Sequence, residues 1–404
     1  MRRFFLFIIS IPLFISCQRN TKVSVFDFPD SYDTRNKTIV LQEKKVFDND
    51  SIVYADNLFD GARLNDFNRL NDSIFQVVIY PENEPINPSP WYAFRVWSKG
   101  DQAIYLDFEY GESKHRYYPK LSMDGVVWKN ADSSAIVYNE EKFDLLKLDL
   151  EKDDTVWVAS QDVLNSDYVY TWAKHFTNEY PIDLKRIGSS VLGRDMVVLE
   201  TAPAAKKTHT LVILSRQHPP EVTGFKAMMY FVDELFSNNS LSTSFLEDHK
   251  VLIFPLLNPD GVDLGHWRHN ANGVDLNRDW ADYKQPEIEV VANYIYSVHK
   301  ESPVIMGLDF HSTYHDVFYT NDTLSIIPDV TNEWFNYMES AIEDYSVNEK
   351  SSPISRPVSK SWFYAAFKAE GVTYEVGDDT EERLIEWKGR TSAVALMQEF
   401  NARE

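Results

Sequence analysis

Alternation of apolar runs with segments of helical periodicity is the feature that most constrains the fold of this 404-residue chain. From about residue 166 onward, four runs are apolar at almost every position, as expected of strands buried on both faces. Apolar residues recur at helical spacing from Glu221 to Phe236 and from Pro286 to His299. We therefore predict an α/β domain over residues 166–404, with a mixed, mainly parallel sheet flanked by helices. The four runs are Leu211 to Leu214, Val251 to Leu257, Val304 to Phe310 and Val372 to Val376.

Residues 51–165 have a different pattern, which predicts an all-β sandwich domain. Short runs rich in β-branched and aromatic residues, such as Ile74 to Tyr80 and Trp91 to Trp97, are separated by clusters of Pro, Asn and Gly. The aromatic residues could form a sugar-binding platform, but filling a sandwich core is the favoured use. Residues 18–50 are polar and without a clear period, which is typical of a tether that leads into the first domain.

The first 17 residues have the pattern of a signal peptide. Arg2 and Arg3 precede an apolar run too short to span a bilayer, and the small Ser16 comes just before Cys17, the single cysteine. The position of Cys17 is similar to that of the lipid-modified cysteine in bacterial lipoproteins. We expect secretion across the inner membrane to the periplasm or outer membrane, with membrane contact only through a lipid anchor at Cys17. The alternative is a short anchor helix with an incidental cysteine.

The chain is strongly acidic, with a formal net charge of −22. Nucleic acid is therefore not an expected partner. An anionic substrate would have to be attracted by a local positive site, because the overall field repels it.

His218, Glu221 and His311 are the candidate metal ligands, because each lies at or just past the end of a predicted strand. Parallel strands bring their carboxyl ends together, so separation in the sequence is no obstacle. A catalytic zinc takes three protein ligands and keeps a position for water, and two His with one Glu is an established set. Two rival histidine pairs lie in stretches of weak helical character and are less favoured. The rival pairs are His311 with His315 and His266 with His269.

Glu375 is the candidate general base for a metal-activated water. It is an acidic residue on an otherwise apolar strand, and such a carboxylate is costly unless it is paired or functional. The alternative is a strand-end carboxylate that faces solvent or pairs with Arg383 or Lys388.

A Gly- and Asn-rich loop between the second and third strands contains Arg268, Asn277 and Arg278. Two guanidinium groups and an amide could form a clamp for a carboxylate, which guanidinium binds in a bidentate manner. The alternative is that these side chains satisfy backbone groups of the loop.

Five short motifs follow one another along residues 166–404: His218 to Glu221, Asn258 to Gly261, Gly273 to Trp280, Asp309 to Ser312 and Tyr374 to Gly377. They occur in the order found in the zinc carboxypeptidases, the relatives of carboxypeptidases A and B, and this part of the chain resembles that family. Further matches in the preceding β domain are Asn57 to Phe59, Trp91 to Phe94, Ser122 to Gly125 and Trp128, through which it is similar to the amino-terminal sandwich of the cytosolic carboxypeptidase-like branch.

The resemblance implies a role for each candidate residue. His218, Glu221 and His311 would bind one zinc ion, and Glu375 would be the general base. Arg268 matches the arginine that polarises the scissile carbonyl and stabilises the oxyanion. Asn277 and Arg278 match the pair that holds the terminal carboxylate of the substrate.

The sequence departs from the family pattern in one place and suggests a preference in another. The digestive members carry a tyrosine on a loop before the base, whereas residues 351–358 contain none. Lys360 falls near the position that sets side-chain preference in the family, and Arg356 is close by. A cation there would favour an acidic terminal residue or an acidic acyl group. The alternative is a solvated lysine on a loop.

We therefore predict a zinc-dependent metallocarboxypeptidase that removes the C-terminal residue of a peptide. Peptidoglycan stem peptides are plausible substrates for an exported enzyme, as are imported or environmental peptides. A second hypothesis keeps the site but makes the chain a zinc-dependent deacylase of N-acyl amino acids. A third makes it a binding protein that has lost catalysis.

Overall fold

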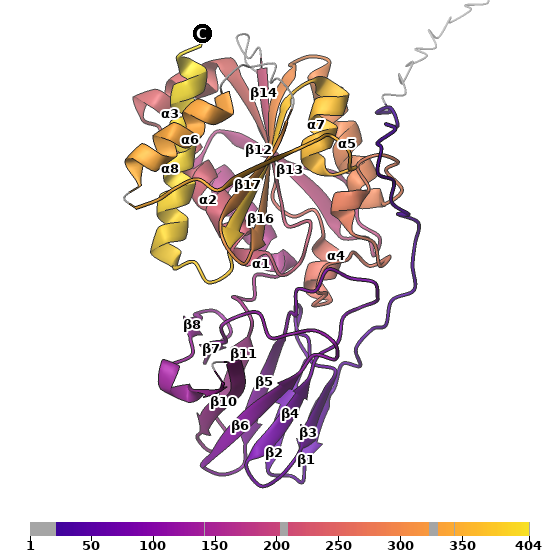
Figure 1. Ribbon diagram of the computed structural model, residues 1–404, viewed down its shortest axis with the longest axis vertical. Helices are drawn as coiled ribbons and strands as arrows, with labels where there is room; N and C mark the ends of the chain where they lie inside the picture. The colour runs from indigo at the N-terminus through magenta and orange to yellow at the C-terminus, as the bar shows by residue number, and fades with distance from the viewer. Residues whose placement is uncertain (1–21, 141, 203–208, 323–329, 343, 404) are drawn as a thin grey trace, which may run out of the picture.

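The structure, a computed structural model, shows two domains stacked along the long axis of the molecule (Figure 1). It describes residues 22–140, 142–202, 209–322, 330–342 and 344–403. The predicted signal peptide and Cys17 lie outside these residues. None of the helices that the structure describes has the length and apolar character needed to cross a membrane.

The amino-terminal domain is all β, as predicted, and consists of two sheets that pack face to face. Alternate residues point inward, so that Phe94 and Val96 of one sheet and Ile104 and Leu106 of the other are completely buried. The six-stranded sheet has the order β1(Val46–Asn49), β2(Val53–Asp56), β5(Ala93–Ser98), β11(Thr155–Ala159), β7(Lys120–Ser122), β8(Lys129–Asn130). The five-stranded sheet has the order β3(Asp66–Arg69), β4(Ile74–Val78), β6(Gln102–Glu109), β10(Lys142–Leu150), β9(Ile136–Asn139), and η1(Ser133–Ala135) is a short turn beside it.

The segment from residue 22 to 45 has no helix or strand and runs along the side of the second domain before it enters the sandwich (Figure 1). Val23 is buried in the core of the second domain, and its backbone N–H donates to Asn293 Oδ1 at 2.9 Å. Further along, the backbone N–H of Asp30 donates to the carbonyl of Ser355 at 2.7 Å. The region expected as a tether is therefore attached to the second domain at several points.

The second domain has the predicted mixed sheet with a parallel centre. The central strands β15, β14, β16 and β19 are parallel, whereas β12 and β13 on one side and β17 on the other include antiparallel pairings. The order across the eight strands is β12(Ile182–Ser189), β13(Asp195–Thr201), β15(His249–Phe254), β14(His209–Ser215), β16(Val304–Thr313), β19(Glu370–Gly377), β17(Val317–Asn321), β18(Glu349–Ser352).

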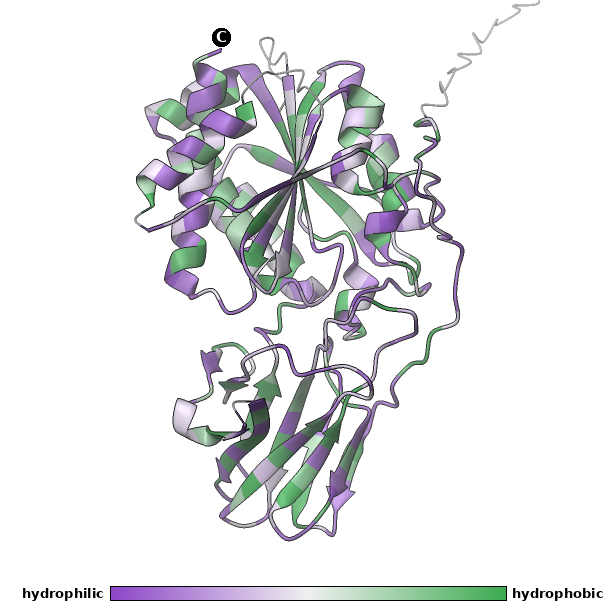
Figure 2. Cartoon of the chain, in the orientation of Figure 1, coloured by the Kyte–Doolittle hydropathy of each residue, from purple (hydrophilic) through white to green (hydrophobic). Residues whose placement is uncertain are grey.

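Helices cover both faces of this sheet (Figure 1). One face packs against α2(Val222–Leu235), with α3(Ser240–Asp248), α6(Val330–Ala341) and α8(Glu382–Asn401) outside it, and the other packs against α5(Pro286–His299) and α7(Ser359–Phe367). Apolar segments run along several of the central strands, whereas α8 carries both apolar and polar residues (Figure 2). Of the remaining elements, α1(Ser166–Glu179) and α4(Pro259–Asp263) lie toward the sandwich, and the short η2(Leu276–Arg278) comes before α5 in the chain.

The two domains are closely joined. The backbone N–H of Gly61 in the sandwich donates to the carbonyl of Asp263 at 2.8 Å. Gly265 has a φ of +65°, and a Cβ at this position would lie 2.4 Å from the carbonyl oxygen of Ala62, so only glycine fits here. Arg116 of the sandwich pairs with Asp378 of the second domain at 2.8 Å, and both side chains are nearly buried. This interface lies beside the carboxyl ends of the parallel strands.

Candidate active site

Strand ends place the three predicted metal ligands together. His218 follows β14, Glu221 precedes the first residue of α2, and His311 lies near the end of β16. Their ligand atoms lie within 4.8 Å of one another, and all three side chains are buried. This is the geometry expected at the carboxyl edge of a parallel sheet, where short loops leave the strands.

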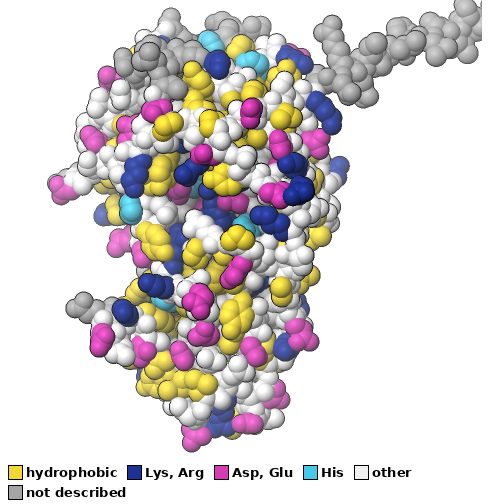
Figure 3. All heavy atoms as spheres, turned by 45° about the vertical axis from the view of Figure 1, so that its right-hand side comes forward, with side chains coloured by type: hydrophobic (Ala, Val, Ile, Leu, Met, Phe, Trp, Pro, Cys, Tyr) yellow, Lys and Arg dark blue, Asp and Glu magenta, His cyan; other side chains and the backbone are white. Residues whose placement is uncertain are grey.

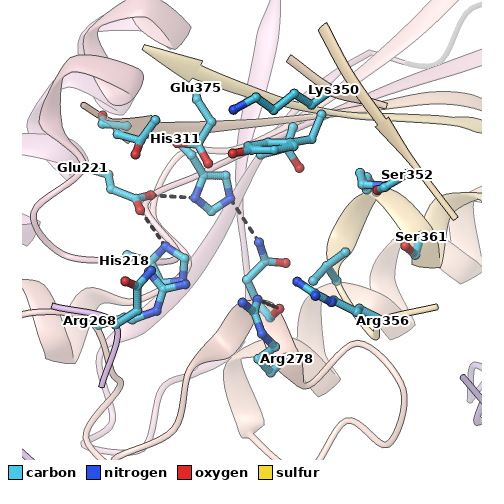
Figure 4. Close-up of a pocket in the computed structure, with 18 of the residues that line it drawn as sticks. His218, Glu221, Arg268, Arg278, His311, Lys350, Ser352, Arg356, Ser361 and Glu375 are labelled. Carbon is cyan, nitrogen blue, oxygen red and sulfur yellow. Dashed lines mark hydrogen bonds and ion pairs between the residues drawn. The ribbon is translucent and has the colours of Figure 1, made fainter. Parts of the chain in front are cut away.

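The carboxylate of Glu221 lies between the two imidazoles (Figure 4). Its Oε1 is 2.7 Å from His218 Nδ1, and its Oε2 is 2.6 Å from His311 Nδ1. Burial would raise the pKa of the Glu221 carboxyl, but the two imidazoles hold it well below its usual range. Two imidazole nitrogens and a carboxylate that face a common point are a donor set suited to zinc.

Each ligand histidine has a second carboxylate at its other ring nitrogen. His218 Nε2 lies 2.9 Å from Asp275 Oδ1, and His311 Nε2 lies 2.8 Å from Asp309 Oδ2. Such partners fix the ring orientation and leave Nδ1 free to bind a metal ion. Neither carboxylate was predicted as part of the site. Asp309, two residues before His311 in an apolar strand, gave the same signal as Glu375 and could have been found by it.

Glu375 lies next to His311, as its register partner on β19. Its side chain is partly exposed and lines a cavity that also contacts the three predicted metal ligands. Its Oε2 has no hydrogen-bond partner. Burial raises the pKa of the carboxyl to about 8, opposed by the charges of His311 and Arg268. Lys388, one of its alternative partners, instead pairs with Asp316 at 2.5 Å. A carboxylate oxygen without a hydrogen-bond partner, beside the three predicted metal ligands, is well placed to accept a proton.

The three residues of the predicted clamp also face this cavity. Arg268 is buried, and its Nε donates to Asp275 Oδ2 at 2.8 Å. Asn277 and Arg278 belong to η2, where the Arg278 guanidinium donates to the carbonyl of Asn277 at 2.7 Å. The backbone N–H of Ser359 donates to Asn277 Oδ1 at 2.9 Å, which fixes the amide. Arg278 lies on the side of His311 away from Glu221 (Figure 4).

One cavity of about 500 Å³ is lined both by the three predicted metal ligands and by the residues of the predicted clamp. Lys360 on α7 also lines this cavity, and its Nζ donates to the carbonyl of Thr320 and to Asn321 Oδ1, both at 2.9 Å. The side chain is buried, not a solvated lysine on a loop, and burial lowers its pKa to about 8. In Figure 3, Lys and Arg side chains gather around the hollow between the domains. Further lining residues are Asn87, Ser89 and Arg116 from the sandwich and Tyr319, Lys350 and Arg356 from the second domain.

The rival histidine pairs do not form a metal cluster. His266 Nδ1 lies 3.0 Å from the carbonyl of His269, and His269 Nδ1 lies 2.6 Å from Asn83 Oδ1. His315 is exposed. In the part of the chain that the structure describes, His218, Glu221 and His311 are the one group of His, Cys, Asp and Glu side chains close enough to share a metal ion.

Comparison with known proteins gives the site its context. Residues 169–386 match the family described as zinc carboxypeptidase. The match covers more than half of the chain and includes all eight residues predicted for the site. The chain belongs to the zinc carboxypeptidase family. Zinc is the metal of this family, and the donor set of His218, Glu221 and His311 fits it.

The relatives include cytosolic carboxypeptidases. Cytosolic carboxypeptidase 2 of Danio rerio is 30% identical over 163 residues, which are 36% of this chain and 23% of the relative. Cytosolic carboxypeptidase 3 of Mus musculus is 22% identical over 308 residues, which are 68% of this chain and 30% of the relative. This zinc carboxypeptidase chain thus spans less than a third of the length of the first curated relatives it matches.

Solved structures share the two-domain architecture. The metallo-carboxypeptidase from Burkholderia cenocepacia superposes with a TM-score of 0.73 at 17% identity, over 87% of this chain and 100% of that chain. The metallo-carboxypeptidase from Pseudomonas aeruginosa, solved in complex with (2-guanidinoethylmercapto)succinic acid, gives 0.69 at 17% identity, over 85% and 98% of the two chains. At this identity the similarity establishes the fold, and the fold includes the β-sandwich as well as the catalytic domain.

Proposed function

We propose that the chain is a metallocarboxypeptidase that hydrolyses the last peptide bond of a peptide and releases the C-terminal residue. One observation carries the proposal: a single cavity joins the metal cluster, the unpaired carboxylate of Glu375 and the group formed by Arg268, Asn277 and Arg278. If these residues hold the terminal carboxylate of a peptide at a fixed distance from the hydrolytic centre, cleavage is limited to the last peptide bond of that substrate.

Each residue of the site has a separate role in the proposed reaction. A zinc ion held by His218, Glu221 and His311 would supply activation of water and polarisation of the carbonyl. Glu375 accepts a proton from the water and later delivers it to the leaving amine. Arg268 faces the oxygen on which negative charge develops. Asn277 and Arg278 hold the terminal carboxylate of the substrate by hydrogen bonds and charge.

An acidic terminal residue is the preferred substrate in this proposal. Among the residues that the structure describes, the Lys360 ammonium donates to two oxygens, and because an ammonium has three donors, one remains for a ligand carboxylate. Arg356 and Lys350 add positive charge to the same cavity. In a chain with a net charge of −22, a local group of cations is what an anionic substrate requires.

Location and natural substrate belong to the proposal as well. With the amino-terminal pattern that ends at Cys17, we propose an exported, lipid-anchored enzyme that acts on peptidoglycan stem peptides or on other peptides outside the inner membrane.

Mass spectrometry of the products tests the reaction. The purified chain is incubated with a peptide library, with purified stem peptides and with acylated amino acids. We expect loss of single C-terminal residues, Glu and Asp first, from the peptides. Turnover of the acylated amino acids alone would instead make the chain a deacylase, and cleavage within peptides would exclude the proposed clamp.

A further inference from the structure

A buried carboxylate of the β-sandwich contacts the backbone that carries Arg268. Glu82 is completely buried. Its Oε2 accepts the backbone N–H of Trp267 at 2.8 Å, and its Oε1 accepts those of Arg268 at 3.1 Å and His269 at 2.6 Å. Three consecutive backbone N–H groups of the catalytic domain thus donate hydrogen bonds to one side chain of the sandwich.

The next residue of the sandwich extends this contact. Asn83 Oδ1 lies 2.6 Å from His269 Nδ1, and Asn83 Nδ2 donates to the carbonyl of Gly273 at 3.0 Å. The two side chains therefore hold both the start and the end of the loop from residue 267 to 273. Burial of a charge is expensive, and adhesion between domains would be achieved at lower cost by apolar groups. Three directed hydrogen bonds also fix the position of the loop, which apolar contacts alone would not do.

The Arg268 side chain extends from this backbone toward the predicted metal ligands and is connected to His218 through Asp275. Its Nε donates to Asp275 Oδ2 at 2.8 Å, and the other oxygen of Asp275 lies 2.9 Å from His218 Nε2. A guanidinium stabilises a developing charge only if it is already in place when the charge appears, so a displacement of its backbone would cost rate.

We propose that Glu82 is a positioning residue, through which the β-sandwich domain fixes the 267–269 backbone and thereby directs Arg268 at the reacting carbonyl. The inference rests on the proposed function for its kinetic consequence. It gives the sandwich a part in catalysis, through a contact made by a side chain that touches neither the metal ligands nor the cavity.

Glu82→Gln is the direct test, since it keeps the shape but replaces one acceptor oxygen by an NH₂ that faces amide donors. We expect kcat to fall about 10- to 100-fold, the range seen for outer partners of catalytic groups, with a smaller change in KM. Asp56→Asn is the matched control, because Asp56 is also a buried carboxylate of the sandwich but pairs with Arg95 within its own domain. We expect this variant to keep the kcat of the unmodified enzyme.

A double-mutant comparison separates positioning from general structure. If Glu82 acts through Arg268, Glu82→Gln should cause little further loss in an Arg268→Ala background. An equal fold-loss in both backgrounds, or no loss in either, would overturn the inference. If Glu82→Gln is too unstable to assay, Glu82→Asp replaces it in the same comparison, since it keeps the charge but moves the oxygens.

Hydrogen exchange at the amides of Trp267, Arg268 and His269 measures whether they are hydrogen-bonded to Glu82, and it does not require enzymatic activity. We expect faster exchange there in Glu82→Gln and no change in Asp56→Asn. If the unmodified protein cleaves no peptide, the proposed function fails while this readout still decides whether Glu82 fixes the loop. Unchanged exchange in Glu82→Gln would reject the positioning role even in an active enzyme.

Discussion

His311 and Glu375 are register partners on the adjacent parallel strands β16 and β19. Side chains at paired positions leave the same face of the sheet, so the register places the candidate base directly beside a metal ligand. A shift of one residue would send one of the two to the opposite face. The separation on which the proposed chemistry depends is therefore fixed by the hydrogen bonds of the sheet.

Replacement of Asp309, whose carboxylate contacts His311, should weaken metal binding. Asp309 Oδ2 lies 2.8 Å from His311 Nε2 and also accepts hydrogen bonds from Gln217 and Ser359. We expect Asp309→Asn to bind zinc about 10- to 100-fold more weakly, as measured by competition with a chelator. The buried Asp263, which pairs with Arg194 instead, provides the control variant Asp263→Asn. Equal zinc affinity in the two variants would contradict the role of Asp309.

Tyr319 should assist the reaction in place of the tyrosine absent from residues 351–358. It pairs with Thr373 across β17 and β19, as Val317 does with Glu375, so its side chain is on the face of Glu375. Loss of one neutral hydrogen bond corresponds to about a 3- to 10-fold decrease, which we expect in kcat/KM for Tyr319→Phe. Tyr364→Phe on α7, outside the cavity lining, should have no effect. A fully active Tyr319→Phe enzyme would leave the accessory role unassigned.

Lys360 should determine the preference for an acidic terminal residue. Replacement by Met keeps most of the buried stem but removes the charge-assisted hydrogen bond, which is worth about 1.5–3 kcal/mol. We expect the ratio of kcat/KM for peptides ending in Glu and in Leu to fall about 10- to 100-fold. The partly exposed Lys147, which pairs with Asp149 on the sandwich, offers Lys147→Met as a control. If the ratio is the same in Lys360→Met and in the unmodified enzyme, another cation sets the preference.

The same preference should depend on pH. Burial lowers the pKa of Lys360 to about 8, so the ammonium is charged below that pH and loses its charge above it. Because kcat/KM reports the free enzyme, the Glu-to-Leu ratio should be constant near pH 7 and fall from pH 8 to 9.5. Lys360→Met should show no such fall. A ratio that stays flat to pH 9.5 in the unmodified enzyme would exclude titration of this lysine.

Most of the catalytic framework could be predicted from the sequence, because it depends on local patterns. The continuous apolar runs gave the parallel centre of the sheet, and the polar residues at their ends gave His218, His311 and Glu375. Parallel strands bring such ends together whatever their order, so no knowledge of the order β15-β14-β16-β19 was needed.

The contacts between distant segments could not be predicted in this way. Glu82 lies in a sandwich loop, and its hydrogen bonds to the 267–269 backbone depend on how two domains pack, which leaves no periodic signal. The attachment of Val23 and Asp30 to the second domain is of the same kind. The family resemblance indicates Lys360, but the burial of this lysine depends on the packing of α7 against the sheet.

The most direct test of the central claim is the activity of Glu375→Gln measured together with its zinc content. The substitution keeps the shape of the side chain and leaves the three ligand residues in place, so zinc should remain at one ion per chain. We predict that hydrolysis of a peptide ending in Glu falls by about 10²- to 10⁴-fold, the usual contribution of a general base. A zinc-loaded Glu375→Gln enzyme with the activity of the unmodified chain would contradict the account.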